Sequence, residues 1–233
     1  MNNVNQKLMN IYSSTKEKTM NFCKKCEDTF KNSEEFIIQY CYCPDKYIES
    51  KTKIMFVGQD PNGWGYETEI LDAMKYTQDA LKKIDWHAPY WRFIHEIESM
   101  INGEKDLSRD YIFWSNIFHI IGDVDPHLML RNNDLTMEYL DHFQTLSAEI
   151  AAADPNILIF LTGPNYDLYI ERIFKDVQFL PVSQTFEVRE LARLTHNNLP
   201  NNTFRLYHPG YANRHKDRLW EPVMQEVKAH LYM

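Results

Sequence analysis

The sequence predicts a three-layer α/β/α fold around a central, mostly parallel sheet of four strands. Four short segments are apolar throughout, as strands buried on both faces are. Amphipathic stretches with helical periodicity separate them. Buried strands that alternate with helices are typical of a parallel sheet covered by helices on each side. The four apolar segments are residues 54–57, 111–113, 157–161 and 204–207.

Helices are predicted in the intervals between these strands. Residues 66–83 carry apolar side chains on one face, and Pro89 fits the first turn of a helix that continues to Ile101. Residues 135–153 form one long amphipathic helix, which Pro155 ends because the residue before a proline disfavours helical geometry. The remaining predicted helices cover residues 166–174 and the segment with Leu219, Val223, Val227 and Leu231 spaced four apart.

The chain is long enough for one large domain, and nothing in its composition divides it. Its 233 residues contain no internal repeat, low-complexity tract or Pro/Gly/Ser-rich linker. Residues 51–233 form the predicted α/β domain. Residues 1–50 are predicted to be a helical N-terminal extension, with Phe36, Ile37 and Tyr40 at helical spacing.

Composition places the chain among globular proteins. Apolar residues make up 44% and aromatic residues 14%, which argues against disorder. No apolar run approaches the roughly 20 residues needed to cross a bilayer, so no membrane partner is expected. The N-terminal residues lack the apolar segment and cleavage site of a secretion signal, and we therefore expect a cytoplasmic protein.

The net charge of −8 argues mildly against a general nucleic-acid binder, but one segment is basic. Residues 205–218 hold four cationic side chains against the single acid Asp217. A solvated helix start is the ordinary interpretation, and the cluster gains a function only if a chemical site lies beside it. The four cations are Arg205, Arg214, Lys216 and Arg218.

All four cysteines lie in the N-terminal extension, as Cys23-x-x-Cys26 and Cys41-x-Cys43. Four thiolates at such spacing are able to bind zinc or an iron–sulfur cluster. Buried or free thiols are the favoured alternative, because Cys-x-Cys is a less usual second half and Tyr42 indicates packing. A disulfide framework is not expected in a chain of this size without a secretion signal.

Polar residues follow each apolar segment, at the edge where parallel strands end and where functional groups gather in such sheets. The first loop reads GQDPNGWG and contains Asp60, and the second is WSN, ending at Asn116. The third reads TGPNY from Thr162, and the fourth begins at His208 as HPGY. Each is ordinary alone, since Asp-Pro-Asn-Gly is a favoured turn sequence. Together they place an acid, an amide and an imidazole at one edge.

These loops resemble the motifs of the uracil-DNA glycosylase superfamily. Its first motif is Gly-Gln-Asp-Pro-Tyr-His, matched in four positions from Gly58, and its last begins His-Pro-Ser, matched in two from His208. Its middle motif is an apolar strand that ends in Asn, as at Asn116. The segment ILIFLTGPNY resembles its penultimate strand and glycine-containing turn. The resemblance covers roughly residues 50–233, in the right order.

The resemblance implies hydrolysis of the N-glycosidic bond of uracil or a modified pyrimidine in DNA, with Asp60 and His208 as catalytic residues. Asp60 would position water and stabilise the cationic sugar, while His208 would donate to the departing base. The backbone N–H of Gln59 would contact the base carbonyl, and Asn116 would read the pyrimidine edge. No cofactor, metal or obligate protein partner is implied.

The resemblance also implies contacts with a flipped base in single- or double-stranded DNA. Trp64 and Tyr66 are candidates for stacking on the base. The candidates for contacts with phosphates, or for filling the gap in the helix, are Gly163, Tyr211, Arg214, Lys216 and Arg218.

The chain departs from the family at positions that select the substrate. The Tyr that excludes thymine is Asn62 here, and the His after it is Gly63. The Ser of His-Pro-Ser is Gly210, and the loop that would wedge into DNA contains Tyr211 and Arg214 where leucine is usual. Two alternatives therefore stay open: an inactive nucleic-acid-binding member of the fold, and an N-glycosidase of free nucleosides or nucleotides.

A second group of polar residues lies in the segment HIIGDVDPH. His119, Asp123, Asp125 and His127 are able to ligate a metal, but an exposed acidic loop is the favoured interpretation.

Overall fold

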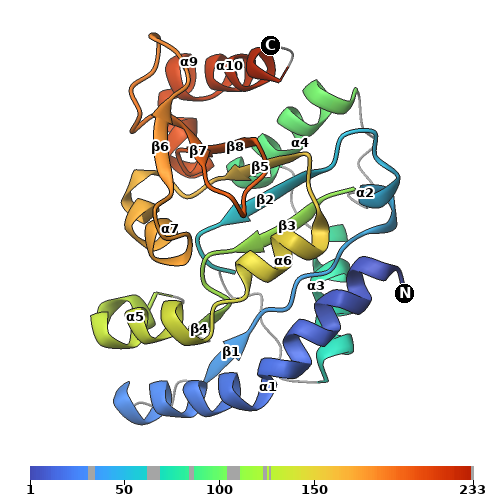
Figure 1. Ribbon diagram of the computed structural model, residues 1–233, viewed down its shortest axis with the longest axis vertical. Coiled ribbons are helices and arrows are strands. Elements are labelled where there is room, and N and C mark those ends of the chain that lie inside the picture. Colours follow the sequence, from blue (N-terminus) through green and yellow to red (C-terminus); the bar gives the residue numbers. More distant parts are fainter. Residues whose placement is uncertain are drawn as a thin grey trace.

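The structure, a computed structural model, describes residues 1–30, 35–61, 69–83, 87–103, 111–122, 125 and 127–231. Its main strands are β2 (Ile54–Gly58), β3 (Phe113–Asn116), β5 (Ile157–Phe160), β6 (Gln178–Pro181), β7 (Leu191–Thr195) and β8 (Asn202–Leu206). They form one sheet in the order β3-β2-β5-β8-β7-β6, and the first four are parallel. The predicted α/β/α fold with a mostly parallel sheet is confirmed (Figure 1).

The sheet has two more strands than predicted, because β7 and β6 extend it as antiparallel strands beyond β8. Neither is a continuous apolar run: β7 reads LARLT, and most of β6 is exposed. An antiparallel edge needs burial on one face only, so its sequence lacks the signal of a doubly buried strand. The second predicted strand, 111–113, is shifted toward the polar residues Ser115 and Asn116.

Helices cover both faces of the sheet, as Figure 1 shows. Alternate residues of β2 point to opposite sides: Met55 and Val57 join one apolar cluster, and Ile54 and Phe56 join the other. The first cluster is covered by α1 (Asn3–Phe30), α3 (Ile70–Lys82), α5 (Asn133–His142), α6 (Leu146–Ala153) and α7 (Asp167–Ile173). The second is covered by α4 (Pro89–Asn102), α8 (Pro209–Ala212), α9 (Lys216–Leu219) and α10 (Glu221–His230). None of the helices in the described ranges is long and apolar enough to cross a membrane.

The long helix predicted over 135–153 is wrong, because two helices, α5 and α6, occupy that segment. Thr145 begins the second helix, and its hydroxyl donates to Glu149 Oε1 at 2.7 Å. Asp154 ends α6 in the left-handed conformation, at φ 46°. The final predicted helix is also divided, since Trp220 adopts non-helical dihedrals between α9 and α10.

The helical prediction for Phe36, Ile37 and Tyr40 is wrong as well. Phe36–Ile38 forms the strand β1, which pairs antiparallel with β4 (Ile120–Gly122). Pairing with another strand satisfies the backbone hydrogen bonds of these residues. The helical spacing of a few apolar side chains does not reveal that such a partner is present. Among the described N-terminal residues, α1 and α2 (Asp45–Glu49) are helical, and α1 shares the first apolar cluster with the sheet.

A buried arginine near the centre of the sheet forms an ion pair with a half-buried carboxylate. Arg205, on β8, is fully buried and forms a bidentate pair with Asp167, with Nε–Oδ1 at 2.8 Å and Nη2–Oδ2 at 2.9 Å. It also donates to the carbonyl oxygens of Arg189 and Val188, each at 2.8 Å. The expectation that Arg205 belongs to an exposed basic cluster is therefore wrong.

Replacing this arginine is expected to destabilise the fold. Arg205→Leu leaves Asp167 and two carbonyl oxygens without their donor, so the free energy of unfolding should fall by about 3–5 kcal/mol. Urea denaturation followed by circular dichroism measures the change. Arg172→Leu is the matched control, because Arg172 forms a bidentate pair with Asp141 on the exposed surface. Equal losses in the two variants would contradict the role assigned to Arg205.

Candidate functional site

The ends of the parallel strands bring the predicted loops together. The register pairs Gly58, at the end of β2, with Asn116, at the end of β3. After β5, the N–H of Gly163 donates to the carbonyl of Leu206 at 2.8 Å, which ties the third loop to the end of β8. The loop residues after β2 and the start of α8 therefore lie at one edge of the sheet.

A pocket of about 350 Å³ opens at this edge. Its volume lies in the range of about 300–1,000 Å³ that is typical of small-ligand sites. Its lining combines the sequence-predicted residues with an aromatic wall from α4 and β3. The lining residues are Gln59, Asp60, Pro61, Ala88, Pro89, Tyr90, Trp91, Trp114, His127, His208 and Gly210.

Asp60 lies in this pocket with its side chain only 5% exposed. Its Oδ2 is 3.2 Å from Nδ1 of His127, whose side chain is 58% exposed. Gln59, the residue before Asp60, donates from its side-chain amide to the carbonyl of Thr162 at 2.7 Å. Asp60 therefore has an imidazole partner, His127, which the sequence analysis assigned to the separate HIIGDVDPH group. His127 covers the carboxylate from the solvent side.

His208 is held in a defined orientation at the start of α8. Its Nδ1 accepts a hydrogen bond from the N–H of Gly210 at 3.1 Å, so the proton of the neutral ring lies on Nε2. Its ring stacks on Tyr90, with centroids 5.4 Å apart and planes at 29°. Burial lowers the pKa of His208 below its ordinary value of 6.5. The site thus holds a neutral imidazole whose Nε2–H is a donor.

Gly210 explains one departure from the family motif. A Cβ at this position would lie 3.1 Å from Nδ1 and 3.4 Å from Cε1 of His208, closer than most real contacts of a Cβ. The glycine therefore lets the backbone N–H approach the ring that it orients.

The aromatic wall was missed by sequence reasoning. Tyr90 Oη accepts a hydrogen bond from Trp114 Nε1 at 3.0 Å, and the ring of Trp91 meets that of Trp114 edge to face at 5.1 Å. A Cβ at Gly58 would collide with Oδ1 of Asn116 and lie 2.7 Å from Tyr90 Oη. The sequence signal for this wall was the segment PYW in the first turn of a helix. Only the tertiary structure reveals that this segment lies beside the strand ends.

Asn116 lies behind the pocket rather than on its lining among the described residues. Its side chain is fully buried, and its amide hydrogen-bonds that of Gln39 at 2.9 Å. With its amide oxygen and nitrogen exchanged, its oxygen would face the Gln39 amide and its nitrogen would donate to the carbonyls of Ser115 and Asp60. For Asn116 to read a base edge, its side chain would have to leave these contacts.

The predicted base-binding residues Asn62, Trp64 and Tyr66 lie outside the described residues. Their roles in base binding therefore stay predictions.

The basic segment beside the pocket is partly neutralised. Arg218 forms a bidentate ion pair with Glu190, with both distances 2.5 Å. Arg214 and Lys216 are exposed, and Nζ of Lys216 lies 5.7 Å from the centre of the Trp220 ring. Two cations at most are thus available for phosphates in this segment, since Arg205 is buried.

An exposed aromatic stack borders the same edge. The ring of Tyr211, which is 43% exposed, lies 4.6 Å from Tyr207 and 4.7 Å from His215. Gly163, at φ 74°, packs against Tyr207, because a Cβ there would lie 3.5 Å from its ring. Arg189 Nε donates to the hydroxyl of Tyr207 at 3.1 Å.

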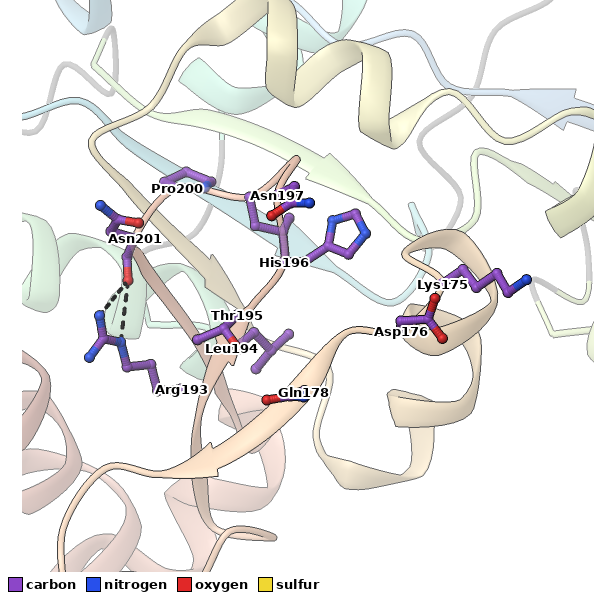
Figure 2. Close-up of a pocket in the computed structure, with 11 residues that line it drawn as sticks. Lys175, Asp176, Gln178, Arg193, Leu194, Thr195, His196, Asn197, Pro200 and Asn201 are labelled. Carbon is purple, nitrogen blue, oxygen red and sulfur yellow. Dashed lines mark hydrogen bonds between the residues drawn. The ribbon is translucent and has the colours of Figure 1, made fainter.

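A larger hollow, of about 490 Å³, lies elsewhere. Figure 2 shows the residues that line it. Its labelled residues include Lys175, Arg193 and His196, and dashed lines join Arg193 to the backbone of Asn201. Asn201 precedes β8, so the hollow lies at the amino end of that strand, opposite the edge that holds His208. Its position argues against a catalytic role.

One group of described residues has the composition of a metal site. Cys41, His119 and Glu149 are buried, with their ligand atoms within 4.8 Å of one another. The alternative of one metal bound by all four cysteines is not supported, because Cys23, Cys26 and Cys43 are buried, are in no disulfide and lie outside this group. The described residues of HIIGDVDPH do not form one group either: His119 faces Glu149, His127 faces Asp60, and Asp125 pairs with Arg131. Asp123 lies outside the described residues.

Comparison with known proteins supports the motif-based interpretation. A search of curated proteins gives no match. A comparison with models of protein families matches residues 45–231 to the Uracil DNA glycosylase superfamily. The match covers the whole sheet and every loop around the pocket, and the chain therefore belongs to the uracil DNA glycosylase superfamily.

Proposed function

We propose that this protein hydrolyses the N-glycosidic bond of uracil or a modified pyrimidine in DNA. The observation that carries the proposal is the pair of Asp60 and His208 in one aromatic-walled pocket. Superfamily membership supports a glycosylase-like activity in general. The substrate and the roles of individual residues are inferred from the resemblance to the superfamily motifs together with the chemistry of the site.

Cleavage of this bond leaves positive charge on the sugar and negative charge on the departing base. A carboxylate near the sugar stabilises the first charge, and a donor aimed at the base oxygen stabilises the second. Asp60 supplies the carboxylate and holds the attacking water. His208 supplies Nε2–H, since its Nδ1 accepts from Gly210. A neutral imidazole suits this role, because its Nε2–H donates a hydrogen bond to the base oxygen without giving up the proton before the N-glycosidic bond breaks.

His127 assists Asp60 in this proposal. The family motif carries a His shortly after the catalytic Asp, where this chain has Gly63. His127 brings an imidazole to Oδ2 of Asp60 from a distant segment, at 3.2 Å. We infer that it orients the carboxylate and the water that Asp60 holds.

The aromatic wall would receive the base after it leaves the helix. Tyr90, Trp91 and Trp114 line the pocket and offer ring faces and edges to a planar ligand. Tyr211 and its neighbouring rings would stack on bases at the mouth of the site. Arg214 and Lys216 would contact phosphates.

One observation favours the alternative of a free nucleoside or nucleotide as substrate. Two of the four cations in the basic segment are engaged in ion pairs, Arg205 with Asp167 and Arg218 with Glu190. A small substrate would need the pocket but no basic groove.

Substitution in the catalytic pair tests the proposal. With an oligonucleotide that contains one uracil, tested single-stranded and as U·A and U·G duplexes, Asp60→Asn and His208→Ala should each lower kcat by about 10²–10⁴-fold. His127→Ala should lower it by about tenfold, since it acts through Asp60. Alkaline cleavage of abasic sites measures the product.

His196→Ala is the matched control, because it removes a histidine from the hollow of Figure 2 and should keep wild-type activity. Wild-type rates in both variants of the pair would refute the assignment of the site. Inactivity of the wild-type protein on all three substrates would exclude uracil as the base.

The neutral state of His208 predicts a pH dependence of stability. Because burial lowers its pKa, the unfolded chain binds the proton first as the pH falls below about 6.5. Wild-type protein should therefore lose stability from pH 7.5 to pH 5.5 more steeply than His208→Gln, which has no proton to bind. Urea unfolding at about these two pH values measures the difference. Identical slopes for the two proteins would argue against a buried neutral imidazole.

Salt dependence distinguishes DNA from a small substrate. If Arg214 and Lys216 contact phosphates, binding to a single-stranded oligonucleotide should weaken with salt, and each alanine variant should reduce the slope by about one unit. Arg218→Ala serves as the comparison and should change the slope less, because Glu190 already neutralises that charge. Fluorescence anisotropy with a labelled oligonucleotide gives the slopes. Cleavage of deoxyuridine without any DNA binding would favour the free-nucleoside alternative.

A further inference from the structure

A second cluster of polar side chains lies in the core, outside the lining of the pocket. Cys41 follows β1, His119 lies between β3 and β4, and Glu149 lies on α6. Sγ of Cys41 is 3.8 Å from Nε2 of His119 and 3.7 Å from Oε2 of Glu149, and the latter two atoms are 3.4 Å apart. Three side chains from distant segments thus direct a sulfur, a nitrogen and an oxygen toward one point.

We propose that Cys41, His119 and Glu149 bind a structural Zn²⁺ ion. In a tetrahedral zinc site, bonds of about 2.3 Å to sulfur and about 2.0 Å to nitrogen and oxygen separate the ligand atoms by about 3.3–3.6 Å. The three distances in the structure lie within about 0.2 Å of that range. The triangle of ligand atoms therefore accommodates the ion without rearrangement of the backbone.

Charge and burial both favour the ion. Cys41 and Glu149 are fully buried, and His119 is 4% exposed. A thiolate and a carboxylate together balance the two positive charges of zinc, while the imidazole stays neutral. The occupied site has no net charge, which is the condition under which ionic groups tolerate complete burial.

The surrounding hydrogen bonds orient the ligands as outer partners of a metal site do. Nδ1 of His119 lies 3.2 Å from Tyr139 Oη, which leaves Nε2 to face the ion. Oε1 of Glu149 accepts from Tyr12 Oη at 2.9 Å and from Thr145 Oγ1 at 2.7 Å, and Oε2 faces Cys41 and His119.

Ser115 holds the same carboxylate. Its Oγ donates to Oε2 of Glu149 at 2.6 Å and lies 3.1 Å from Nε2 of His119, so it is an outer partner of the three ligands. The combination of sulfur, nitrogen and oxygen donors favours zinc, because magnesium and calcium take oxygen ligands.

The site would connect the N-terminal segment to the catalytic edge. Gln39, two residues before Cys41, donates its N–H to the carbonyl of His119 at 2.8 Å and pairs with the amide of Asn116. Ser115 is the neighbour of Asn116 on β3. An ion bound by Cys41 and His119 would thereby fix the position of Gln39 against Asn116, although binding of the ion does not depend on the proposed activity.

Metal content of the full-length, untagged protein tests the site. After incubation with Zn²⁺ and gel filtration, elemental analysis should find about one zinc per chain in the wild-type protein and less than about a tenth of that in Cys41→Ala and Glu149→Gln. Cys26→Ala is the matched control, because Cys26 is also a buried free thiol but lies outside the group, and it should retain the ion.

Measurements on the wild-type protein keep the test decisive if a variant fails to fold. Removal of zinc with EDTA should lower the melting temperature, and added Zn²⁺ should restore it. Co²⁺ added to the metal-free protein should give a thiolate-to-metal charge-transfer band. Wild-type protein that takes up neither ion would refute the site. Full zinc content in both ligand variants would place the ion elsewhere and would equally overturn the proposal.

Discussion

The parallel register of β2 with its two neighbours is the constraint on which the candidate site depends. Gly58 lies opposite Asn116 on one side, and Val57 lies opposite Phe160 on the other. Because the three strands end at nearly the same level, their loops begin at one edge. Gly58 allows the ends of β2 and β3 to lie close together, since a Cβ at this position would collide with the side-chain amide of Asn116. Substituting that glycine would disturb the end of the central strand and also Tyr90, which lines the pocket.

The site places two titratable groups in contrasting surroundings. Burial keeps His208 neutral, and a backbone N–H selects which nitrogen carries its proton. Asp60 faces an imidazole whose other side is open to solvent. The glycine at position 210 and the histidine at position 127 contribute to this arrangement, although neither matches the family motif.

The N-terminal segment is part of the same physical unit as the sheet. Burial alone would raise the pKa of Glu149, but His119, Ser115 and Thr145 outweigh it and lower the pKa to about 2. Tyr12, on α1, donates to the same carboxylate, and its hydroxyl accepts from the N–H of Cys41 at 3.1 Å. A buried anion with partners from α1, β3 and α6 makes these elements depend on one another, because loss of any donor leaves the charge less satisfied.

The sequence by itself determined the layered fold, the parallel strands and the positions of Asp60 and His208, because doubly buried strands are continuous apolar runs and loops at their ends face one edge. It did not reveal β6, β7 or the pairing of β1 with β4, since edge strands and strand partners leave weak local signals. The tertiary structure alone decided that Arg205 is buried, that Arg218 is neutralised and that Asn116 faces Gln39. It also brought His127 to Asp60 and Cys41 to Glu149. These contacts join residues far apart in the chain, and no local pattern of residue types specifies which distant partner a side chain meets.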